Sequence, residues 1–291
     1  MKRQSKRKNV TAILTSDWHL SEKPPKCRTE TPEEWLTTMA TKLEFISKLQ
    51  YKYDCAVYHA GDLFDHWKPS PFLLSWVMKR MPKKFTTILG NHDIPFHFIG
   101  GYQKCGVRVL AESGHVQLDE NGLHWEDDLI NRVQDFPWFM AHIMTYKGKE
   151  PWPGCEDLNT KEMLEHFPNA DLIVTGHNHS AFTDNIGKRR LVNPGSIFRL
   201  TADQIDHKPR VYLWDIDTNS IELVYLPIQE GRVTRHHLEE DQAKNDRIKK
   251  FMDNLEATWE PQFSLEKNLE IAIKKNKIPK RVANLIWEAI G

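Results

Sequence analysis

The chain has 291 residues, and its 40 Lys and Arg are matched by 40 Asp and Glu, so the formal net charge is zero. Neutrality argues against a protein that binds nucleic acid through bulk positive charge, although it leaves room for a local basic path. Hydrophobic residues at 40% and charged residues at 27% are typical of a folded globular chain and exclude an intrinsically disordered one.

The sequence carries no membrane or export signal. Charge-free apolar stretches such as Pro71 to Met78 are far shorter than the ~18–20 residues that a spanning helix needs. A basic segment over residues 1–9 is followed by an apolar run too short for a signal peptide. The four cysteines are dispersed and contain no C-x-x-C pair, which indicates reduced thiols. We therefore expect a cytoplasmic protein.

Short apolar runs that end abruptly in polar residues recur along the first two thirds of the chain. They begin at Thr11, Cys55, Phe85, Trp138 and Ala170. Continuous apolar runs of this length are typical of strands that are buried on both faces.

Helical patterns lie between these runs. Thr31 to Glu34 forms a capping box with proline at the first helical position, and apolar residues follow at helical spacing. Ser70-Pro71 predicts a second helix through Met81, and a third begins at Asn159 or Thr160 and ends before Pro168. The alternation of strand and helix predicts a layered α/β domain.

The pattern changes near residue 188. Strands over 190–199, 210–217 and 220–228, with a turn signal at Asp217 to Ser220, suggest a second sheet of antiparallel strands. Residues 232–291 are charged and helical, with apolar faces that include Ile248 and Leu255, and then Val282 and Leu285. We expect a basic N-terminus over 1–9, one large domain over 10–231 and a helical appendage over 232–291. That appendage either packs on its own domain or docks a partner.

Polar residues with metal-ligand chemistry follow these predicted strands. The candidates are Asp17, His19, Asp62, Asn91, His142, His177 and His179. Carboxylates, imidazoles and an amide oxygen suit Mn²⁺, Fe²⁺ or Zn²⁺. Strands of one sheet bring their carboxyl ends to a common edge, so these donors can meet there. Two ions with one bridging carboxylate would use the whole set.

Each fragment alone has an ordinary structural explanation. A Gly-Asp pair is commonly a turn, and an Asn-His pair is commonly a loop. His59 alternates into a strand and is interpreted as a core histidine. The joint occurrence of five such fragments, each at the end of an apolar run, favours the metal site. His142 is preferred for the fourth fragment because it ends a strand-like run. The alternatives between the third and fifth fragments are His97, His115, His124 and His166.

The ordered motifs D-x-H, G-D, G-N-H-D, H and G-H-x-H resemble those of the calcineurin-like metallophosphoesterase superfamily. The resemblance covers about residues 10 to 200 and implies a four-layer αββα sandwich with two mixed sheets. It implies a dinuclear centre of divalent ions, Mn²⁺ first among them, with Fe, Zn, Mg or Ni as alternatives. One ion would take Asp17, His19, Asp62 and His179; the other would share Asp62 and add Asn91, His142 and His177. Asn193 to Ser196 is similar to a turn that many members carry close to the site.

The resemblance also implies a mechanism. A hydroxide that bridges the two ions would attack phosphorus, because divalent ions lower the pKa of bound water. His92 would lie beside the scissile phosphate as general acid or charge stabiliser, oriented by Asp93.

One stretch is similar to the DNA-repair nuclease branch of SbcD-type subunits. It is Gly61 to Phe64 followed by Lys68-Pro-Ser70. That branch usually has a histidine directly after Phe64, whereas this chain has Asp65 there and His66 next. The branch implies a phosphodiesterase or nuclease acting on DNA or RNA, a role in DNA repair and an ATPase partner subunit.

Three functions stay open from the sequence. The first is a nucleic-acid phosphodiesterase, with Trp18, Trp67 and Trp152 near motif loops where a base could stack. The second is a phosphatase or phosphodiesterase for nucleotides or other small phosphoesters. The third is a non-catalytic scaffold with the same fold.

Overall fold

The computed structural model describes residues 9–97, 99–119, 123–124, 136–236 and 264–288, together with residues 242, 246 and 249. Residues 1–8 of the basic N-terminus lie outside this part of the chain. The chain divides into two compact units, 1–234 and 235–291. Each unit is described by itself.

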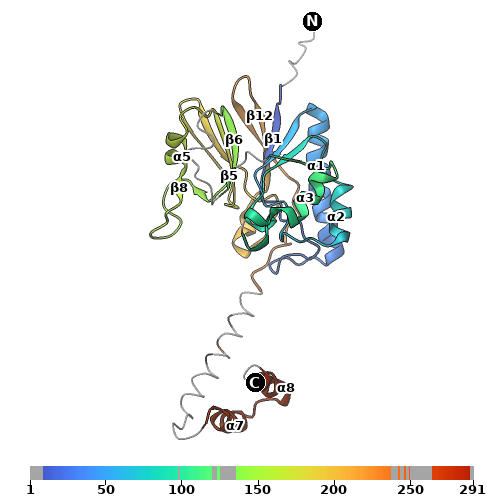
Figure 1. Ribbon diagram of the computed structural model, residues 1–291, viewed down its shortest axis with the longest axis vertical. Coiled ribbons are helices and arrows are strands. Elements are labelled where there is room, and N and C mark those ends of the chain that lie inside the picture. Colours follow the sequence, from blue (N-terminus) through green and yellow to red (C-terminus); the bar gives the residue numbers. More distant parts are fainter. Residues whose placement is uncertain are drawn as a thin grey trace. The chain divides into compact units, whose positions relative to one another are not determined.

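The first unit is built on a six-stranded mixed sheet with the order β13-β12-β1-β2-β3-β4 (Figure 1). Its strands are β1 (Ala12–Thr15), β2 (Ala56–His59), β3 (Phe85–Thr87), β4 (Gln117–Leu118), β12 (Arg210–Asp215) and β13 (Ser220–Tyr225). Strands β1 to β4 run parallel, whereas β12 is antiparallel to β1 and β13 is antiparallel to β12.

A second mixed sheet has the order β10-β11-β9-β6-β5. Its strands are β5 (Leu123–His124), β6 (Trp138–His142), β9 (Leu172–Gly176), β10 (Phe182–Ile186) and β11 (Arg189–Asn193). Only the β10–β11 pair is antiparallel among these described strands. Between β6 and β9 along the chain, two short parallel strands, β7 (Thr145–Tyr146) and β8 (Leu158–Asn159), form a separate two-stranded sheet.

The two sheets pack face to face through a shared apolar core. Leu14 and Trp214 of the first sheet belong to the same buried cluster as Met140 and Val174 of the second. Because both faces of β1 and β9 are covered, their residues are buried without alternation, as the continuous apolar runs predict.

Helices cover the outer face of each sheet (Figure 1). Those on the six-stranded sheet are α1 (Pro32–Tyr53), α2 (Pro71–Met78) and α3 (Gly106–Glu112), and α5 (Thr160–His166) covers the other. Short 3₁₀ helices are η1 (Asn91–Asp93), η2 (Pro95–His97), η3 (Ile99–Lys104) and η4 (Ala202–Asp206). The layers therefore run helix, sheet, sheet, helix, and the expected αββα sandwich with two mixed sheets is confirmed.

The ends of α1 and α2 follow from local chemistry. The Thr31 hydroxyl accepts a hydrogen bond from the Glu34 N–H, and the Glu34 carboxylate accepts one from the Thr31 N–H. This reciprocal pair is the capping box that the sequence predicts. Helix α2 ends at Met78, three residues before the predicted Met81.

The prediction of a separate antiparallel sheet after residue 188 is wrong. Strand β11 joins the second sheet, parallel to β9, whereas β12 and β13 extend the first sheet beside β1. The hairpin β12–β13 is a local structure, and the turn sequence Asp217 to Ser220 predicted it. The partner of β12, β1, lies about 200 residues away, and β11 pairs with β9 across the intervening strand β10; a local pattern does not encode such pairings.

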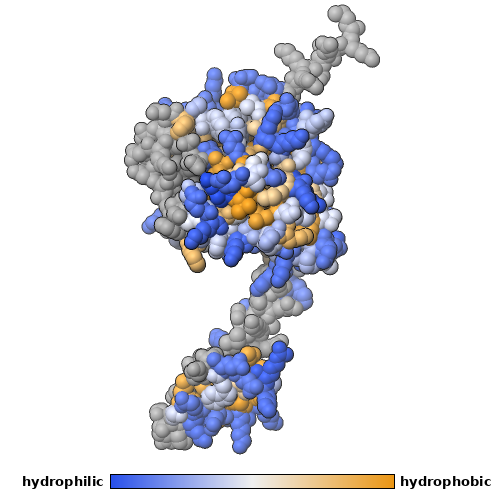
Figure 2. All heavy atoms as spheres, turned by 45° about the vertical axis from the view of Figure 1, so that its right-hand side comes forward, coloured by the Kyte–Doolittle hydropathy of each residue, from blue (hydrophilic) through white to orange (hydrophobic). Residues whose placement is uncertain are grey.

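The second unit contains two described helices, α7 (Leu265–Lys275) and α8 (Lys280–Glu288). Leu269 and Ala272 of α7 are buried, whereas Val282 and Leu285 of α8 are exposed. Figure 2 shows hydrophobic residues on the surface of this small unit. The predicted apolar face with Ile248 and Leu255 lies outside the described residues. Among the helices that the structure describes, none combines the length and the apolar character needed to cross a membrane.

Candidate metal centre

The predicted donors occupy the carboxyl ends of five strands. Asp17 and His19 follow β1, Asp62 follows β2, and Asn91 opens η1 after β3. In the second sheet, His142 is the last residue of β6, and His177 and His179 follow β9. Both sheets present these ends at the same edge, which is where α/β proteins build sites.

Four of these residues have left-handed backbone conformations. The φ angles are 51° at Asp17, 42° at His19, 58° at Asp62 and 82° at His177. Such conformations cost free energy in non-glycine residues, and they gather where the surrounding structure holds a functional geometry. Here main-chain hydrogen bonds stabilise these conformations. The N–H groups of Asp17 and His19 donate to the carbonyls of Gly61 and Asp62, both at 3.0 Å.

A first group of donors consists of Asp17, His19 and His179. The Nε2 atoms of His19 and His179 are 3.0 Å apart, and Nε2 of His179 lies 4.0 Å from Oδ1 of Asp17. That Oδ1 atom also accepts a hydrogen bond from the His177 N–H at 2.9 Å. Asp17 and His19 are both buried, so their donor atoms face each other in a region of low solvent access.

A second group consists of Asp62, His142 and His177. Oδ1 of Asn91 joins this group, because it lies 3.0 Å from Nε2 of His142 and 2.9 Å from Nδ1 of His177. Nδ1 of His142 lies 2.8 Å from the Ala60 carbonyl. That acceptor places the ring proton on Nδ1 and leaves Nε2 to act as a ligand.

Asp62 lies between the two groups. Its Oδ2 atom is 3.5 Å from Nε2 of His19 and 3.3 Å from Nε2 of His142. Its Oδ1 atom accepts the main-chain N–H of His92 at 2.9 Å. A carboxylate in this position can bridge two ions.

Electrostatics in the site are set by burial and by these carboxylates. Burial alone would lower the pKa of His142, but the neighbouring Asp62 carboxylate outweighs it and raises that pKa to about 9. Burial lowers the pKa of His179 to about 4, although Asp17 opposes the shift. Protons and metal ions therefore compete for Nε2 of His142, because only the neutral ring binds a metal.

The donor set fits a divalent metal centre. Oδ2 of Asp17 is buried and forms no hydrogen bond among the described residues. Buried polar atoms are nearly always satisfied, so an unsatisfied carboxylate oxygen beside His19 and His179 indicates a ligand that completes it. Nitrogen and carboxylate oxygen donors within reach of one another are the chemistry that Mn²⁺, Fe²⁺ and Zn²⁺ bind.

His92 lies at the rim of both groups. Its ring stacks edge-on against His19 with centroids 4.7 Å apart, and its Nδ1 atom lies 2.8 Å from the Asp65 main-chain carbonyl. The carboxylate of Asp93 is buried and accepts three main-chain N–H groups, from Leu63, Phe64 and Gly90. The expected orienting contact from Asp93 is thus replaced by the Asp65 carbonyl. Asp93 ties the second and third motif loops together.

Asp65 is the residue to which sequence reasoning gave no role. Its carboxylate lies 3.5 Å from Nδ1 of His19, and Asp65, His19 and His92 form a third group of close donors. The sequence contained a sign that this position belongs to the site, because Asp65 stands where the similar nuclease branch has histidine.

Two glycines allow the motif loops to approach each other. A Cβ atom on Gly90 would lie 2.1 Å from Oδ1 of Asp62, and a Cβ atom on Gly61 would lie 2.4 Å from Nδ1 of His142. Gly61 also has a φ of 87°, which disfavours other residues. The G-D and G-N-H-D motifs therefore need glycine for close packing around Asp62.

The turn 193–196 braces the last motif. The Asn193 side-chain amide donates to the carbonyls of Asn178 and Ser180, both at 2.6 Å. The Ser196 N–H donates to the His179 carbonyl at 3.1 Å. The turn holds the loop of His177 and His179 against the sheet edge.

Among the competing histidines, two bond locally and away from this edge. His115 is exposed beside the Ser113 hydroxyl, and His166 contacts the Glu162 carbonyl on α5. The side chains of His97 and His124 lie outside the described residues. His59 is buried in β2, with Nδ1 2.8 Å from the Thr87 hydroxyl, as predicted for a core histidine.

The three tryptophans that were predicted to stack a base differ in their exposure to solvent. Trp18 is fully buried, and its indole N–H donates to the Thr15 hydroxyl, so its proposed stacking role is wrong. Trp67 is half-buried against the core of the first sheet. Trp152 is 49% exposed.

A cavity of about 860 Å³ opens beside the donors. His19, His92, His179 and Asp65 line one part of it. Its other lining residues include three exposed lysines, Lys23, Lys26 and Lys68. A volume of this size accommodates a substrate larger than a single phosphate group.

Fold and site together define a metal-dependent phosphoesterase. Residues 11–219 match the family described as the calcineurin-like phosphoesterase superfamily domain. The chain belongs to this superfamily, as the motifs predict, and its members act on phosphoesters with divalent metal ions.

Several solved structures are similar in backbone fold. An archaeal phosphodiesterase is 13% identical, with 74% of this chain and 99% of that chain covered and a TM-score of 0.40. A metallophosphoesterase from Sphaerobacter thermophilus is 15% identical, with 75% and 89% covered and a TM-score of 0.36. A putative 5′-nucleotidase from Staphylococcus aureus is 15% identical, with 83% and 58% covered and a TM-score of 0.48. No curated protein sequence matches the chain.

Proposed function

We propose that this protein is a dinuclear metal-dependent phosphodiesterase that cleaves nucleic acid, with Asp62 as the bridging ligand. The observation that carries the proposal is the position of His92, with the donors His19 and His179, in a cavity lined by three exposed lysines. A polyanion with several phosphates would gain from these lysines, whereas a small phosphomonoester would contact the donors alone.

The chain's own residues supply orientation and proton handling. Two bound divalent ions would polarise the phosphoryl oxygens and supply hydroxide at neutral pH. The Asp65 carbonyl fixes the proton-bearing Nδ1 of His92, and a protonated His92 can then donate from Nε2 to an oxygen of the phosphate or the leaving group. Asp93 maintains the loop spacing on which this geometry depends.

The test compares hydrolysis of four substrates, each with Mn²⁺ and with EDTA. They are bis-p-nitrophenyl phosphate, p-nitrophenyl phosphate, single-stranded DNA and double-stranded DNA, with a matched RNA as a further arm. We expect cleavage of the diester and of a nucleic acid in Mn²⁺, and none in EDTA.

Other outcomes identify the competing functions. Hydrolysis of the monoester alone would contradict the proposal and favour an enzyme for small phosphoesters. Full metal occupancy with no turnover on any substrate would favour a non-catalytic scaffold. Activity that survives EDTA and complete metal removal would contradict the metal dependence.

A further inference from the structure

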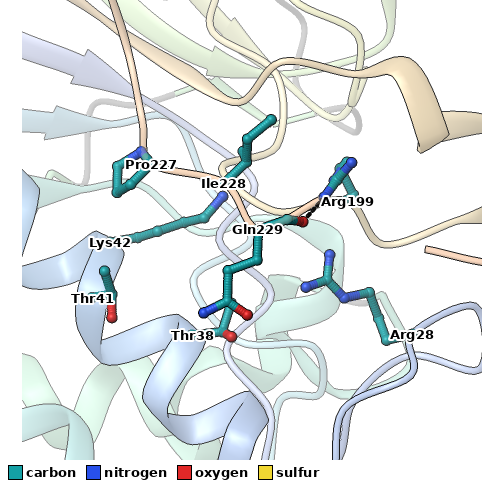
Figure 3. Close-up of a pocket in the computed structure, with 8 residues that line it drawn as sticks. All are labelled: Arg28, Thr38, Thr41, Lys42, Arg199, Pro227, Ile228 and Gln229. Carbon is teal, nitrogen blue, oxygen red and sulfur yellow. Dashed lines mark hydrogen bonds between the residues drawn. The ribbon is translucent and has the colours of Figure 1, made fainter. Parts of the chain in front are cut away.

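A second cavity, of about 220 Å³, lies between helix α1 and the segment that follows β13 (Figure 3). It shares no lining residue with the cavity beside the metal donors. Its lining residues are Arg28, Thr38, Thr41, Lys42, Arg199, Pro227, Ile228 and Gln229. Three of these eight are cations, and none is a carboxylate.

The three cations are almost completely buried. The side chains of Arg28, Lys42 and Arg199 are each 4% exposed. Figure 3 shows that Lys42 and Arg28 extend toward the same space from opposite sides, with Arg199 beside them. Lysine and arginine are rarely buried unless they are paired, so the burial of three such side chains around one cavity requires an explanation.

Neutral carbonyl groups accept hydrogen bonds from two of these cations, Lys42 and Arg199. The Lys42 ammonium donates to the Ile197 carbonyl at 2.5 Å and lies 5.0 Å from the centre of the Phe198 ring. The Arg199 guanidinium donates to the carbonyls of Ile205 at 3.1 Å and Gln229 at 2.5 Å. These contacts orient the donors but neutralise no charge.

Carboxylates near the cavity are too few to balance it. Glu30 is buried and forms an ion pair with Arg28. Glu230 lies 3.9 Å from Arg199, but it is 81% exposed. Among the described residues, two carboxylates therefore face three buried cations, and only one of the two carboxylates is buried. Burial, followed by the charges of Arg28 and Arg199, holds the pKa of Lys42 well below its usual range.

We propose that this cavity is a binding site for a tetrahedral oxyanion of the phosphate type. Arginine guanidinium groups bind such anions with paired hydrogen bonds, and two arginines and one lysine line this cavity. The volume is below the ~300–1,000 Å³ of sites that enclose a whole organic ligand, and it is large enough for one phosphate group with bound water. The phosphate is either free or the end of a nucleotide whose base stays outside.

Occupancy of this site would reach the metal centre through the main chain. Lys42 bonds to the carbonyl of Ile197, and the preceding residue, Ser196, donates its N–H to the His179 carbonyl. The oxyanion site thus lies behind the turn that braces the last metal-binding motif.

The test is calorimetric titration of inorganic phosphate into the full-length protein in EDTA. Removal of metal abolishes phosphate binding at the metal centre, so remaining binding that a variant at the second cavity weakens reports that cavity and does not depend on the proposed function. Parallel titrations use a deoxynucleoside 5′-monophosphate and the same nucleoside without phosphate.

Two exposed threonines of α1 give a matched pair of variants. Thr41 lines the cavity and Thr37 does not, and each hydroxyl donates to the carbonyl four residues earlier. Thr41→Glu places a carboxylate at the cavity and should weaken phosphate binding by about tenfold or more. Thr37→Glu adds the same charge outside it and should leave binding unchanged. Lys42→Met, which keeps the length of the buried chain, should also weaken binding by about tenfold or more.

The outcomes are decisive in both directions. Phosphate binding in EDTA that Thr41→Glu weakens and Thr37→Glu retains supports the site. Binding of the monophosphate as well identifies a nucleotide phosphate as a ligand, and its failure to bind identifies free phosphate. No binding to the metal-free wild type, equal binding by the two threonine variants, or binding of the nucleoside without phosphate would overturn the proposal.

Discussion

Nδ1 of His92 lies 2.8 Å from the main-chain carbonyl oxygen of Asp65. A main-chain acceptor holds the imidazole in a way that substitution of the Asp65 side chain does not remove. The orientation of His92 therefore depends on the loop that follows Asp62, whose carboxylate lies between the two donor groups.

We predict that His92→Ala retains both metals and loses most turnover. General acid catalysis contributes about 10²–10⁴-fold, so the rate on bis-p-nitrophenyl phosphate should fall by that order. Metal content is measured by atomic spectroscopy on the same sample. A near wild-type rate with metal intact would contradict the assigned role.

Gly90→Ala should reduce metal content. The added Cβ would lie 2.1 Å from Oδ1 of Asp62, so the carboxylate or its loop must move, whereas the φ of −100° at Gly90 suits alanine. The expected result is a folded protein with sub-stoichiometric metal and low activity. Gly114→Ala is the control, because it meets no atom within 4 Å and is strained only by its positive φ. Equal metal content in the two variants would show that space near Asp62 is not limiting.

The lysines of the large cavity should matter for nucleic acid and not for small esters. Replacing Lys23, Lys26 and Lys68 by Gln should lower the rate on DNA by about tenfold or more and flatten its salt dependence. The rate on bis-p-nitrophenyl phosphate should stay within about twofold, because that substrate carries one phosphate. A control replaces the exposed Lys48, Lys79 and Lys83, which do not line the cavity. Equal effects of the two triple variants would contradict a nucleic-acid path.

Folding stability should depend on the protonation of His59. Burial, aided by the nearby His142 charge, holds the pKa of His59 well below its ordinary value of 6.5. Below about pH 6.5 the unfolded chain then binds a proton that the folded chain does not, so the free energy of unfolding falls as the pH falls.

His59→Leu should make this pH dependence shallower. The Thr87 hydroxyl keeps an acceptor in the Ile88 carbonyl, so the variant leaves no unsatisfied partner there. Urea unfolding at pH 7 and pH 5, in EDTA, measures the slope. Replacement of the exposed His115 by Leu is the control and should not change it. An unchanged slope in His59→Leu would contradict the assignment.

The sequence predicted the layered architecture, through alternating strands and helices and a resemblance to a known superfamily, and it predicted the candidate donor set. Apolar runs of strand length and a capping box at Thr31 are local signals, and local signals are read without knowledge of the fold. The candidate ligands were predictable for a related reason. Each follows its strand directly, and strands of one sheet deliver their ends to one edge, so their meeting requires only the sheet order.

The tertiary structure decided what depends on long-range contacts. It places the strands after residue 188 in two different sheets. The ring of His92 contacts the main-chain carbonyl of Asp65 and not the carboxylate of Asp93, and Trp18 is buried in the core. It also gathered Arg28, Lys42 and Arg199 around one cavity, where Lys42 contacts a carbonyl 155 residues away. A net charge of zero conceals this local excess, because composition sums charges that only the fold places side by side.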